Sequence, residues 1–298
     1  MSRRGWALFV AMCLIWGIPY LLIKVAVSDV SPVTLVFFRT VIGALILVPI
    51  ALARGNLAPA LPHWRWIALY TAAEVALPWF LVSDAELRLS SSLTALLIAA
   101  TPFVGVVLGR VTGSDDRFDA RRLFGLVVGF VGVAVLVGLN VSVRDLGAAG
   151  EIGLVAICYA IGPLIISRKL TEAPPIGVVA ISLVLPAIVY APLGLSHLPS
   201  AIPPTHVLLA IGLLGVVCTA IAFLLFFALI AEVGPVRATV ITYVNPAVAL
   251  ALGVTLLGEP LTIGAGVGFA LILVGLFLLT RRASRTLAPA EEPLVEAR

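Results

Sequence analysis

Ten runs of mostly apolar residues, separated by short polar stretches, fill most of this chain. Each run has about the length that a helix needs to cross the hydrocarbon core of a bilayer, which is roughly 20 residues. The pattern therefore predicts an all-helical (all-α) integral membrane protein with ten transmembrane helices. The predicted spans are 5–27, 32–53, 66–84, 91–110, 122–140, 149–167, 175–195, 206–231, 235–257 and 261–280.

The apolar pattern occurs twice along the chain. With an offset of 144 residues, Pro102 aligns with Pro246 and Asp115 aligns with Glu259. A nearly constant offset over half of the chain indicates an internal duplication. The predicted repeats are 5–140 and 148–282.

Each predicted repeat contains five spans, so the second repeat must enter the membrane from the side opposite to the first. Inverted repeats of this kind recur among secondary transporters, whose substrate sites lie near the bilayer midplane between the halves. We therefore expect two inverted five-helix repeats around a central cavity, and we expect the exposure of this cavity to alternate between the two sides of the membrane.

The composition is that of a protein surrounded by lipid. Of the 298 residues, 61% are hydrophobic and 11% are charged, and the mean hydropathy is +1.18. Charged residues make up about a quarter of a typical soluble protein. The first apolar run is too long for the apolar region of a signal peptide, so we expect a retained helix. Residues 283–298 are expected to form a disordered cytoplasmic tail.

The basic residues predict the orientation of the chain. If the N-terminus is cytoplasmic, fourteen Lys and Arg residues fall on the cytoplasmic side of the predicted spans, and only Arg88 and Arg144 fall on the other side. Cytoplasmic loops of membrane proteins carry such an excess. We expect a multi-pass protein of the cell (inner) membrane with both termini cytoplasmic. The net charge of +4 is explained by this distribution, and we expect no nucleic-acid partner.

No motif favours an enzyme. The chain lacks a P-loop and an HExxH pattern, and its three cysteines lie far apart in predicted spans. Asp115, Asp116 and Asp119 match the DDxxD pattern with which membrane prenyltransferases hold Mg²⁺, but no second acidic motif accompanies them. We interpret this segment as a solvated loop, and we expect no catalytic residue, no metal and no cofactor.

Both ends of the chain resemble a known family. The opening segments IWGIPYLLIKVAV and SPVTLVFFRTVIGALIL, and the closing segment NPAVALALGVTLLGEPLTIGAGVGFALILVGLFLL, are similar to those of the ten-helix EamA-type proteins of the drug/metabolite transporter (DMT) superfamily. The resemblance covers nearly the whole chain and implies export of small metabolites, often amino acids, by alternating access. In the first repeat, Ser114-Asp115 replaces the expected Gly-Glu corner.

Four positions are candidates for gating or hinge motion. Pro102 and Pro246 interrupt helical hydrogen bonding at related places in the two repeats. Gly258 and Glu259 form the corner between the last two predicted spans.

Charged residues inside predicted spans are the main candidates for a substrate site, because such residues are costly in lipid and usually face a cavity or one another. Glu74 is expected to bind a substrate ammonium or a coupling proton, and Arg39 a carboxylate. The alternative is a structural ion pair between these two residues. Lys24 lies nearer the predicted outer surface, and for it we favour a side chain that reaches the lipid headgroups.

Aromatic and amide side chains lie at similar depths. Tyr70 is one helical turn from Glu74 and shares its face. Stacking on aromatic rings favours apolar or aromatic solutes, although ordinary packing explains most individual rings. For Asn245 we favour repair of the backbone near Pro246 over substrate binding. The full set of these candidates is Trp16, Tyr20, Tyr70, Trp79, Tyr159, Tyr243 and Asn245.

These features predict a secondary transporter that exports small metabolites, with neutral or aromatic amino acids as the favoured substrates. The expected partners are a small-molecule substrate, the lipid bilayer and protons as the coupling ion, and the expected assembly is a monomer or a weak dimer. A nucleotide-sugar or phosphate-ester exchanger is the alternative transport function, and a membrane-embedded prenyltransferase is an alternative of another class.

Overall fold

The computed structural model describes residues 1–112, 120–238 and 240–280. In this part of the chain all regular structure is helical. Eight helical stretches are long and apolar enough to cross a membrane, and two further apolar helices are shorter. The prediction of an all-helical membrane protein with ten spans is confirmed. The Asp115–Asp119 segment and the tail after residue 282 lie outside the described residues.

The first repeat contains spans one to five. They are formed by α1 (Arg3–Ile15) with α2 (Pro19–Ala26); α3 (Pro32–Ala53); α4 (Leu57–Ala60), η1 (Leu61–His63), α5 (Trp64–Thr71), η2 (Ala72–Ala76) and α6 (Leu77–Ala85); α7 (Ser91–Ile98) with α8 (Thr101–Val111); and α9 (Ala120–Asn140).

The second repeat contains spans six to ten. They are formed by η3 (Val143–Asp145) with α10 (Leu146–Lys169); α11 (Pro175–Ser196); α12 (Thr205–Gly215), η4 (Val216–Ile221) and α13 (Ala222–Val233); α14 (Pro235–Ala238) with α15 (Ile241–Leu256); and α16 (Ile263–Thr280).

Capping residues fix where several spans begin. Ser31 precedes Pro32, the first residue of α3, and its hydroxyl accepts a hydrogen bond from Thr34 N at 3.3 Å. Ser90 caps α7 in the same way through Leu93 N at 3.2 Å. A serine N-cap satisfies one of the free amide groups of the first turn, and proline at the first helical position loses no hydrogen bond.

Two spans of the first repeat are broken. Span one is interrupted between Ile15 and Pro19, and span four is interrupted between Ile98 and Thr101. Pro102 therefore lies in the first turn of α8, directly after a break, whereas Pro246 lies inside the continuous helix α15. The two prolines occupy related places in the sequence but different local structures. α8 begins one residue before Pro102, whereas α15 begins five residues before Pro246.

The third span of each repeat contains a π-helical segment. These are η2 in span three, which includes Glu74, and η4 in span eight, which includes Thr219. π-helical turns are rare and are frequently found at functional sites. Their appearance at matching places in both repeats was not visible in the apolar pattern.

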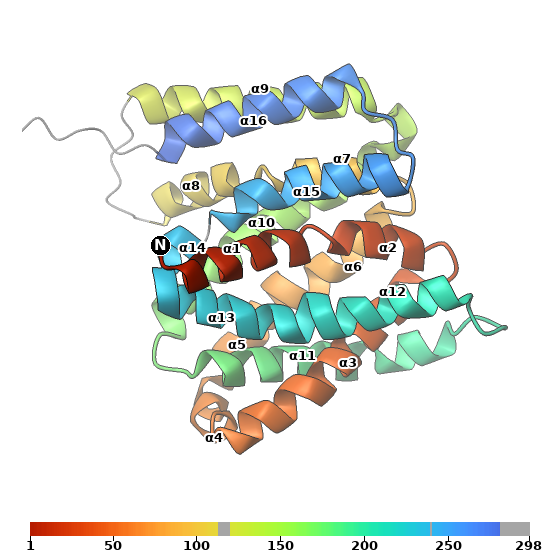
Figure 1. Ribbon diagram of the computed structural model, residues 1–298, viewed down its shortest axis with the longest axis vertical. Helices are drawn as coiled ribbons and strands as arrows, with labels where there is room; N and C mark the ends of the chain where they lie inside the picture. Colours follow the sequence, from red (N-terminus) through yellow and green to blue (C-terminus); the bar gives the residue numbers. More distant parts are fainter. Residues whose placement is uncertain (113–119, 239, 281–298) are drawn as a thin grey trace, which may run out of the picture.

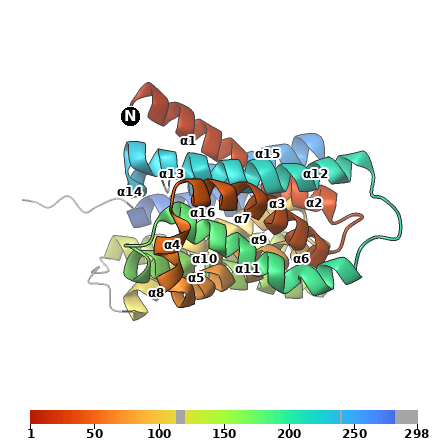
Figure 2. The same ribbon diagram turned by 90° about the horizontal axis from the view of Figure 1, so that it is seen from below.

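Corresponding spans of the two repeats lie side by side. α3 packs along α11, and α9 packs along α16; the second pair forms one edge of the bundle, at the top of Figure 1. The start of α1 and the end of α16 lie at the same end of the bundle (Figure 1). A view turned by 90° shows the long helices running along a common direction (Figure 2).

Glycines bring α9 and α16 into close contact. A Cβ atom at Gly132 would lie 2.8 Å from Gly268 O and 2.9 Å from Ile272 N, and a Cβ at Gly125 would lie 2.8 Å from Gly275 O. In lipid, helices associate through such close packing of small residues, because the apolar solvent provides little hydrophobic driving force.

We expect Gly132→Ala to destabilise the protein by about 1–3 kcal/mol, because the new methyl group meets backbone atoms that cannot move independently. Gly266→Ala is the matched control on the partner helix, since no heavy atom lies within 4 Å of its added Cβ. Thermal unfolding in detergent measures both. Equal effects of the two substitutions would contradict the close contact.

Candidate functional site

One of the two deep charged residues, Arg39, lies where α3, α6 and η4 meet. Arg39 of α3 is only 7% exposed. Its Nε donates a hydrogen bond to Thr219 Oγ1 at 3.1 Å, and its guanidinium carbon lies 3.6 Å from the centroid of the Trp79 ring. The Thr219 hydroxyl donates in turn to Leu214 O at 2.8 Å. A cation over a tryptophan face is stabilised by the ring quadrupole, so the guanidinium is held in place by neutral groups from two elements, α6 and η4.

Arg39 and Glu74 do not form the structural ion pair that the sequence left open. Among the described residues, the ion pairs all involve Arg88. Burying a cation and a carboxylate without direct pairing is costly. Both groups therefore retain the capacity to bind an additional charged partner.

Glu74 reaches from η2 toward α10. Its Oε2 atom is buried and has no hydrogen-bond partner among the described residues. A Cβ atom at Gly162 of α10 would overlap this carboxylate, so an alanine there would displace the Glu74 carboxyl group. Tyr70, Tyr159 and Cys158 are close enough to interact electrostatically with Glu74.

Tyrosines connect the two charged groups. Tyr159 of α10 is within electrostatic range of both Glu74 and Arg39, and Tyr20 of α2 is within range of Arg39 and Tyr159. Arg39, Glu74, Tyr20, Tyr70 and Tyr159 thus form one cluster of buried and half-buried side chains from both repeats, with Trp79 as the platform for the guanidinium. We call these six residues the central cluster.

The other predicted site residues lie elsewhere. Trp16 packs against Phe223 and Phe226, with ring centroids 6.0 and 4.7 Å apart. Tyr243 packs at the edge of the main apolar core. These two rings have packing partners of their own, separate from the charged groups.

Asn245 bridges two helices. With its amide nitrogen facing the nearby carbonyl oxygens, it donates to Ile241 O at 2.9 Å and to Cys13 O at 3.1 Å. Cys13 lies at the end of α1, where Gly17 N donates to Leu14 O and so leaves the regular helical pattern. Asn245 therefore satisfies a carbonyl at the break in span one. The expected role was repair of the backbone near Pro246, but this second contact lies on α1, a neighbouring helix.

Lys24 does not reach for headgroups, and that prediction was wrong. Its Nζ donates to Glu86 O at 2.5 Å and to Leu89 O at 2.8 Å. Carbonyls at the end of α6 have no intrahelical donor, and they offer the ammonium a better partner than the membrane surface.

The corner before the last span acts on another helix. Gly258 adopts φ +66°, which lets the chain turn after α15. The Glu259 carboxylate accepts hydrogen bonds from Ser91 N at 2.7 Å, Ser92 N at 3.0 Å and Ser92 Oγ at 2.5 Å. A carboxylate at the first turn of a helix complements the free amide groups and the helix dipole. Glu259 of the second repeat thus caps α7 of the first repeat.

These hydrogen bonds also set the protonation state of the corner. Partial burial raises the pKa of Glu259, but the hydrogen bonds from Ser92 and Ser91 outweigh it, and the net pKa lies below its ordinary value. Glu259 is therefore ionised at neutral pH.

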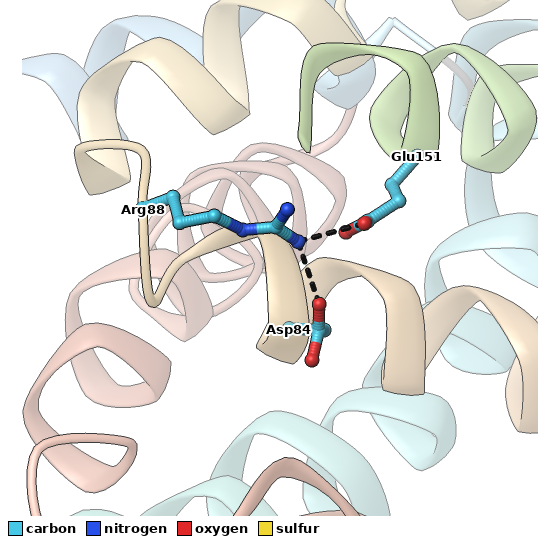
Figure 3. Close-up of polar contacts among 3 residues, drawn as sticks. All are labelled: Asp84, Arg88 and Glu151. Atoms are coloured by element: carbon cyan, nitrogen blue, oxygen red, sulfur yellow. Dashed lines mark hydrogen bonds and ion pairs between the residues drawn. The ribbon is translucent and has the colours of Figure 1, made fainter. Parts of the chain in front are cut away.

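An ion-pair cluster joins the end of α6 to the start of α10. Arg88 Nη2 lies 2.7 Å from Asp84 Oδ2 and 2.7 Å from Glu151 Oε1 (Figure 3). The three side chains are partly exposed, so the expected gain is below about 1 kcal/mol per pair. The cluster connects the two repeats, and none of its three residues belongs to the central cluster.

A groove of about 480 Å³ opens between α3, α12 and the connection 198–203. Thr34, Phe38 and Leu208 are among its lining residues, and the lining is mostly apolar. Neither Arg39 nor Glu74 lines it, so the groove is separate from the charged site.

Two residues of the charged site were missed from the sequence. Thr219 was hidden because a single hydroxyl in an apolar span is common, and Gly162 because a glycine gives no sign of what it accommodates. One signal for Thr219 was available in the sequence. Its segment of the second repeat corresponds to the segment of the first repeat that contains Glu74.

Family comparison agrees with this architecture. The model of the EamA-like transporter family matches residues 3–138 and again residues 152–281. The chain belongs to the EamA-like transporter family. It is a membrane transporter by family, and its two matched segments each contain five of the spans described above.

Two named bacterial proteins are similar to this chain along nearly their whole length. The "Uncharacterized inner membrane transporter YedA" of Escherichia coli (strain K12) is 30% identical over 280 residues, covering 92% of this chain and 89% of that protein. A "Probable amino-acid metabolite efflux pump" of Salmonella typhimurium is 23% identical over 291 residues, covering 93% and 95%.

A solved structure shares the fold. Named only "Crystal structure of protein", it superposes with a TM-score of 0.66 at 20% identity, covering 94% of this chain and 97% of that chain. Together with the apolar helices, these likenesses support a multi-pass protein of the inner membrane.

We expect Glu259→Ala to lower the stability by about 1–2 kcal/mol, because α7 loses its cap. Since the pKa of Glu259 is lowered in the folded protein, this contribution is present at neutral pH and is lost as the pH falls through that lowered value. Thermal unfolding from neutral to acidic pH measures it. Glu172→Ala, at an exposed position, is the control; an equal loss there, or no pH dependence, would refute the cap.

Proposed function

We propose that this protein is a secondary transporter that exports small zwitterionic metabolites, with neutral and aromatic amino acids as the favoured substrates. The observation that carries the proposal is the central cluster, in which the buried guanidinium of Arg39 and the half-buried carboxyl group of Glu74 have no direct ionic partner among the described residues. The Salmonella typhimurium relative is named a "Probable amino-acid metabolite efflux pump". This name supports the same substrate class.

The proposed binding mode follows from the charges. The substrate carboxylate binds the guanidinium of Arg39, which Thr219 and Trp79 hold in a fixed orientation. The substrate ammonium binds Glu74, and the hydroxyls of Tyr20, Tyr70 and Tyr159 are available to the polar atoms between them. Because both protein charges are desolvated, a zwitterion gains from both at once, and a neutral solute gains from neither.

Transport then requires that a cavity at the central cluster open to one side at a time. The breaks in spans one and four and the π-helical segments η2 and η4 interrupt regular helical bonding beside the cluster, and they are the proposed places of bending. Pro102 belongs to one of these breaks, while Gly258 and Glu259 hold α7 from the other repeat. We propose protons as the coupling ion, and a monomer or weak dimer as the working unit.

The carboxyl group of Glu74 disfavours the alternative substrates. A nucleotide sugar or phosphate ester would bring negative charge toward a buried acid, which is unfavourable at low dielectric. An amino acid presents a positive group there. Counterflow with phosphate esters separates the two classes.

Uptake into proteoliposomes tests the binding mode with a panel of radiolabelled amino acids. We expect Arg39→Gln and Glu74→Gln each to reduce transport kcat/KM by about ten- to hundred-fold, the loss expected when a hydrogen bond to a charged group worth about 1.5–3 kcal/mol is removed. The matched controls are Arg54→Gln, at an exposed position at the end of α3, and Glu172→Gln.

Full transport by both central-cluster variants would exclude these residues from substrate binding. Failure of every amino acid in the panel, with active counterflow of phosphate esters, would replace the substrate class with the alternative.

We also propose that both termini are cytoplasmic. The start of α1 and the end of α16 lie at the same end of the bundle (Figure 1), and the distribution of basic residues favours the cytoplasm for that end. Fusions of a cytoplasmic and a periplasmic reporter at each terminus measure the orientation. We expect activity only from the cytoplasmic reporter; activity of the periplasmic reporter at either terminus would invert or break the topology.

A further inference from the structure

A second buried acid lies outside the central cluster. Glu86 directly follows α6, in the turn that leads to α7, and its residue is 0% exposed. Neither carboxylate oxygen has a hydrogen-bond partner in the described part of the chain. A buried polar atom without a partner is rare in proteins and calls for a physical explanation.

The surroundings of Glu86 do not favour a carboxylate. The residue caps the C-terminal end of α6, where the helix dipole is negative. Lys24, which interacts electrostatically with Glu86, donates to the backbone oxygens of Glu86 and Leu89 instead of to the carboxyl group. The charged and titratable groups that interact with Glu86 are Lys24 and Tyr20 of α2 and Glu259 of the α15–α16 corner.

Glu259 and Glu86 therefore have opposite hydrogen-bonding environments. Glu259 receives three hydrogen bonds from the first turn of α7 and remains ionised. The Glu86 carboxyl group receives no hydrogen bond from the described residues. Burial raises the pKa of Glu86 well above its ordinary value, the Lys24 ammonium lowers it in part, and the Glu259 carboxylate raises it again. When the environments of two acids push their pKa values apart in this way, one acid acts as a fixed charge and the other can carry a proton.

We propose that Glu86 is a proton-binding site at the α6–α7 turn, distinct from the central cluster, and that loss of its proton moves the Lys24 ammonium from the two carbonyls to the carboxylate. The proton leaves to water at that end of the bundle, and a Lys24–Glu86 ion pair forms in its place. The carbonyls of Glu86 and Leu89 lose their donor, so the turn between spans three and four loosens when the proton departs.

Proton binding at Glu86 does not depend on which substrate is transported. In the orientation proposed above, the α6–α7 turn faces outwards, so the external pH would set the occupancy of Glu86. Burial raises the pKa of the Glu86 carboxyl group. The protonated form is therefore favoured at low pH and is lost as the pH rises through this raised pKa.

Infrared spectroscopy of the purified protein in lipid tests this directly, since a protonated carboxyl group has a C=O stretching band that the carboxylate lacks. We expect wild-type protein at neutral pH to show a band of a carboxyl group without a hydrogen-bond donor, and to lose it on alkaline titration. Glu86→Gln should abolish this band, and Glu86→Asp should shift its frequency. Glu74→Gln, which removes the buried acid of the central cluster, should leave it in place.

Lys24→Met provides the second measurement. Without the ammonium, the band should persist to higher pH than in the wild type, because the cation that stabilises the Glu86 carboxylate is gone. Absence of the band in wild-type protein at neutral pH, or its persistence in Glu86→Gln, would overturn the proton site. An unchanged titration in Lys24→Met would overturn the exchange of partners. Neither result depends on transport, so each is distinguishable from failure of the proposed substrate class.

Discussion

In lipid, no water satisfies a backbone group that leaves the helical pattern, so every interruption of a span must find a partner inside the protein. This chain interrupts its spans repeatedly, and side chains from other spans close the gaps. Asn245 serves the break in span one, and Glu259 caps span four. Both come from the second repeat and act on the first. The same constraint that permits the breaks therefore ties the repeats together by polar contacts.

Packing supplies the other half of this connection. α9 and α16 meet through glycines, and α3 and α11 through an apolar surface. These contacts are rigid because the glycine and apolar groups that form them have no other group to pack against. The polar contacts differ, since a carbonyl, a carboxylate or an ammonium can exchange one partner for another at low cost. Motion between the repeats is therefore expected where polar side chains close a helix break, and not along the glycine seam.

The sequence predicted the spans because each is a long apolar run, and it predicted Arg39 and Glu74 because charges are rare in such runs. It did not predict η2, η4 or Thr219, since a π-helical turn and the partner of an arginine depend on neighbouring helices. Lys24 was misread for the same reason: its depth was visible, but the carbonyls of Glu86 and Leu89 were not. Pro102 and Pro246 show the limit of aligning repeats, because equal places in a sequence need not have equal backbone structure.

The acids of this protein illustrate how surroundings assign roles to one side-chain type. Glu151 pairs with Arg88 near the surface, Glu259 accepts donors from α7, Glu74 faces the tyrosines of the central cluster, and Glu86 faces the end of α6 without a donor. Only donors or cations can hold a buried carboxylate in its charged form. The first two acids have them and act as fixed anchors. Among the described residues, Glu74 Oε2 and both carboxylate oxygens of Glu86 have no hydrogen-bond partner, so each acid can complete its environment by taking up a positive charge, from a substrate ammonium or from a proton.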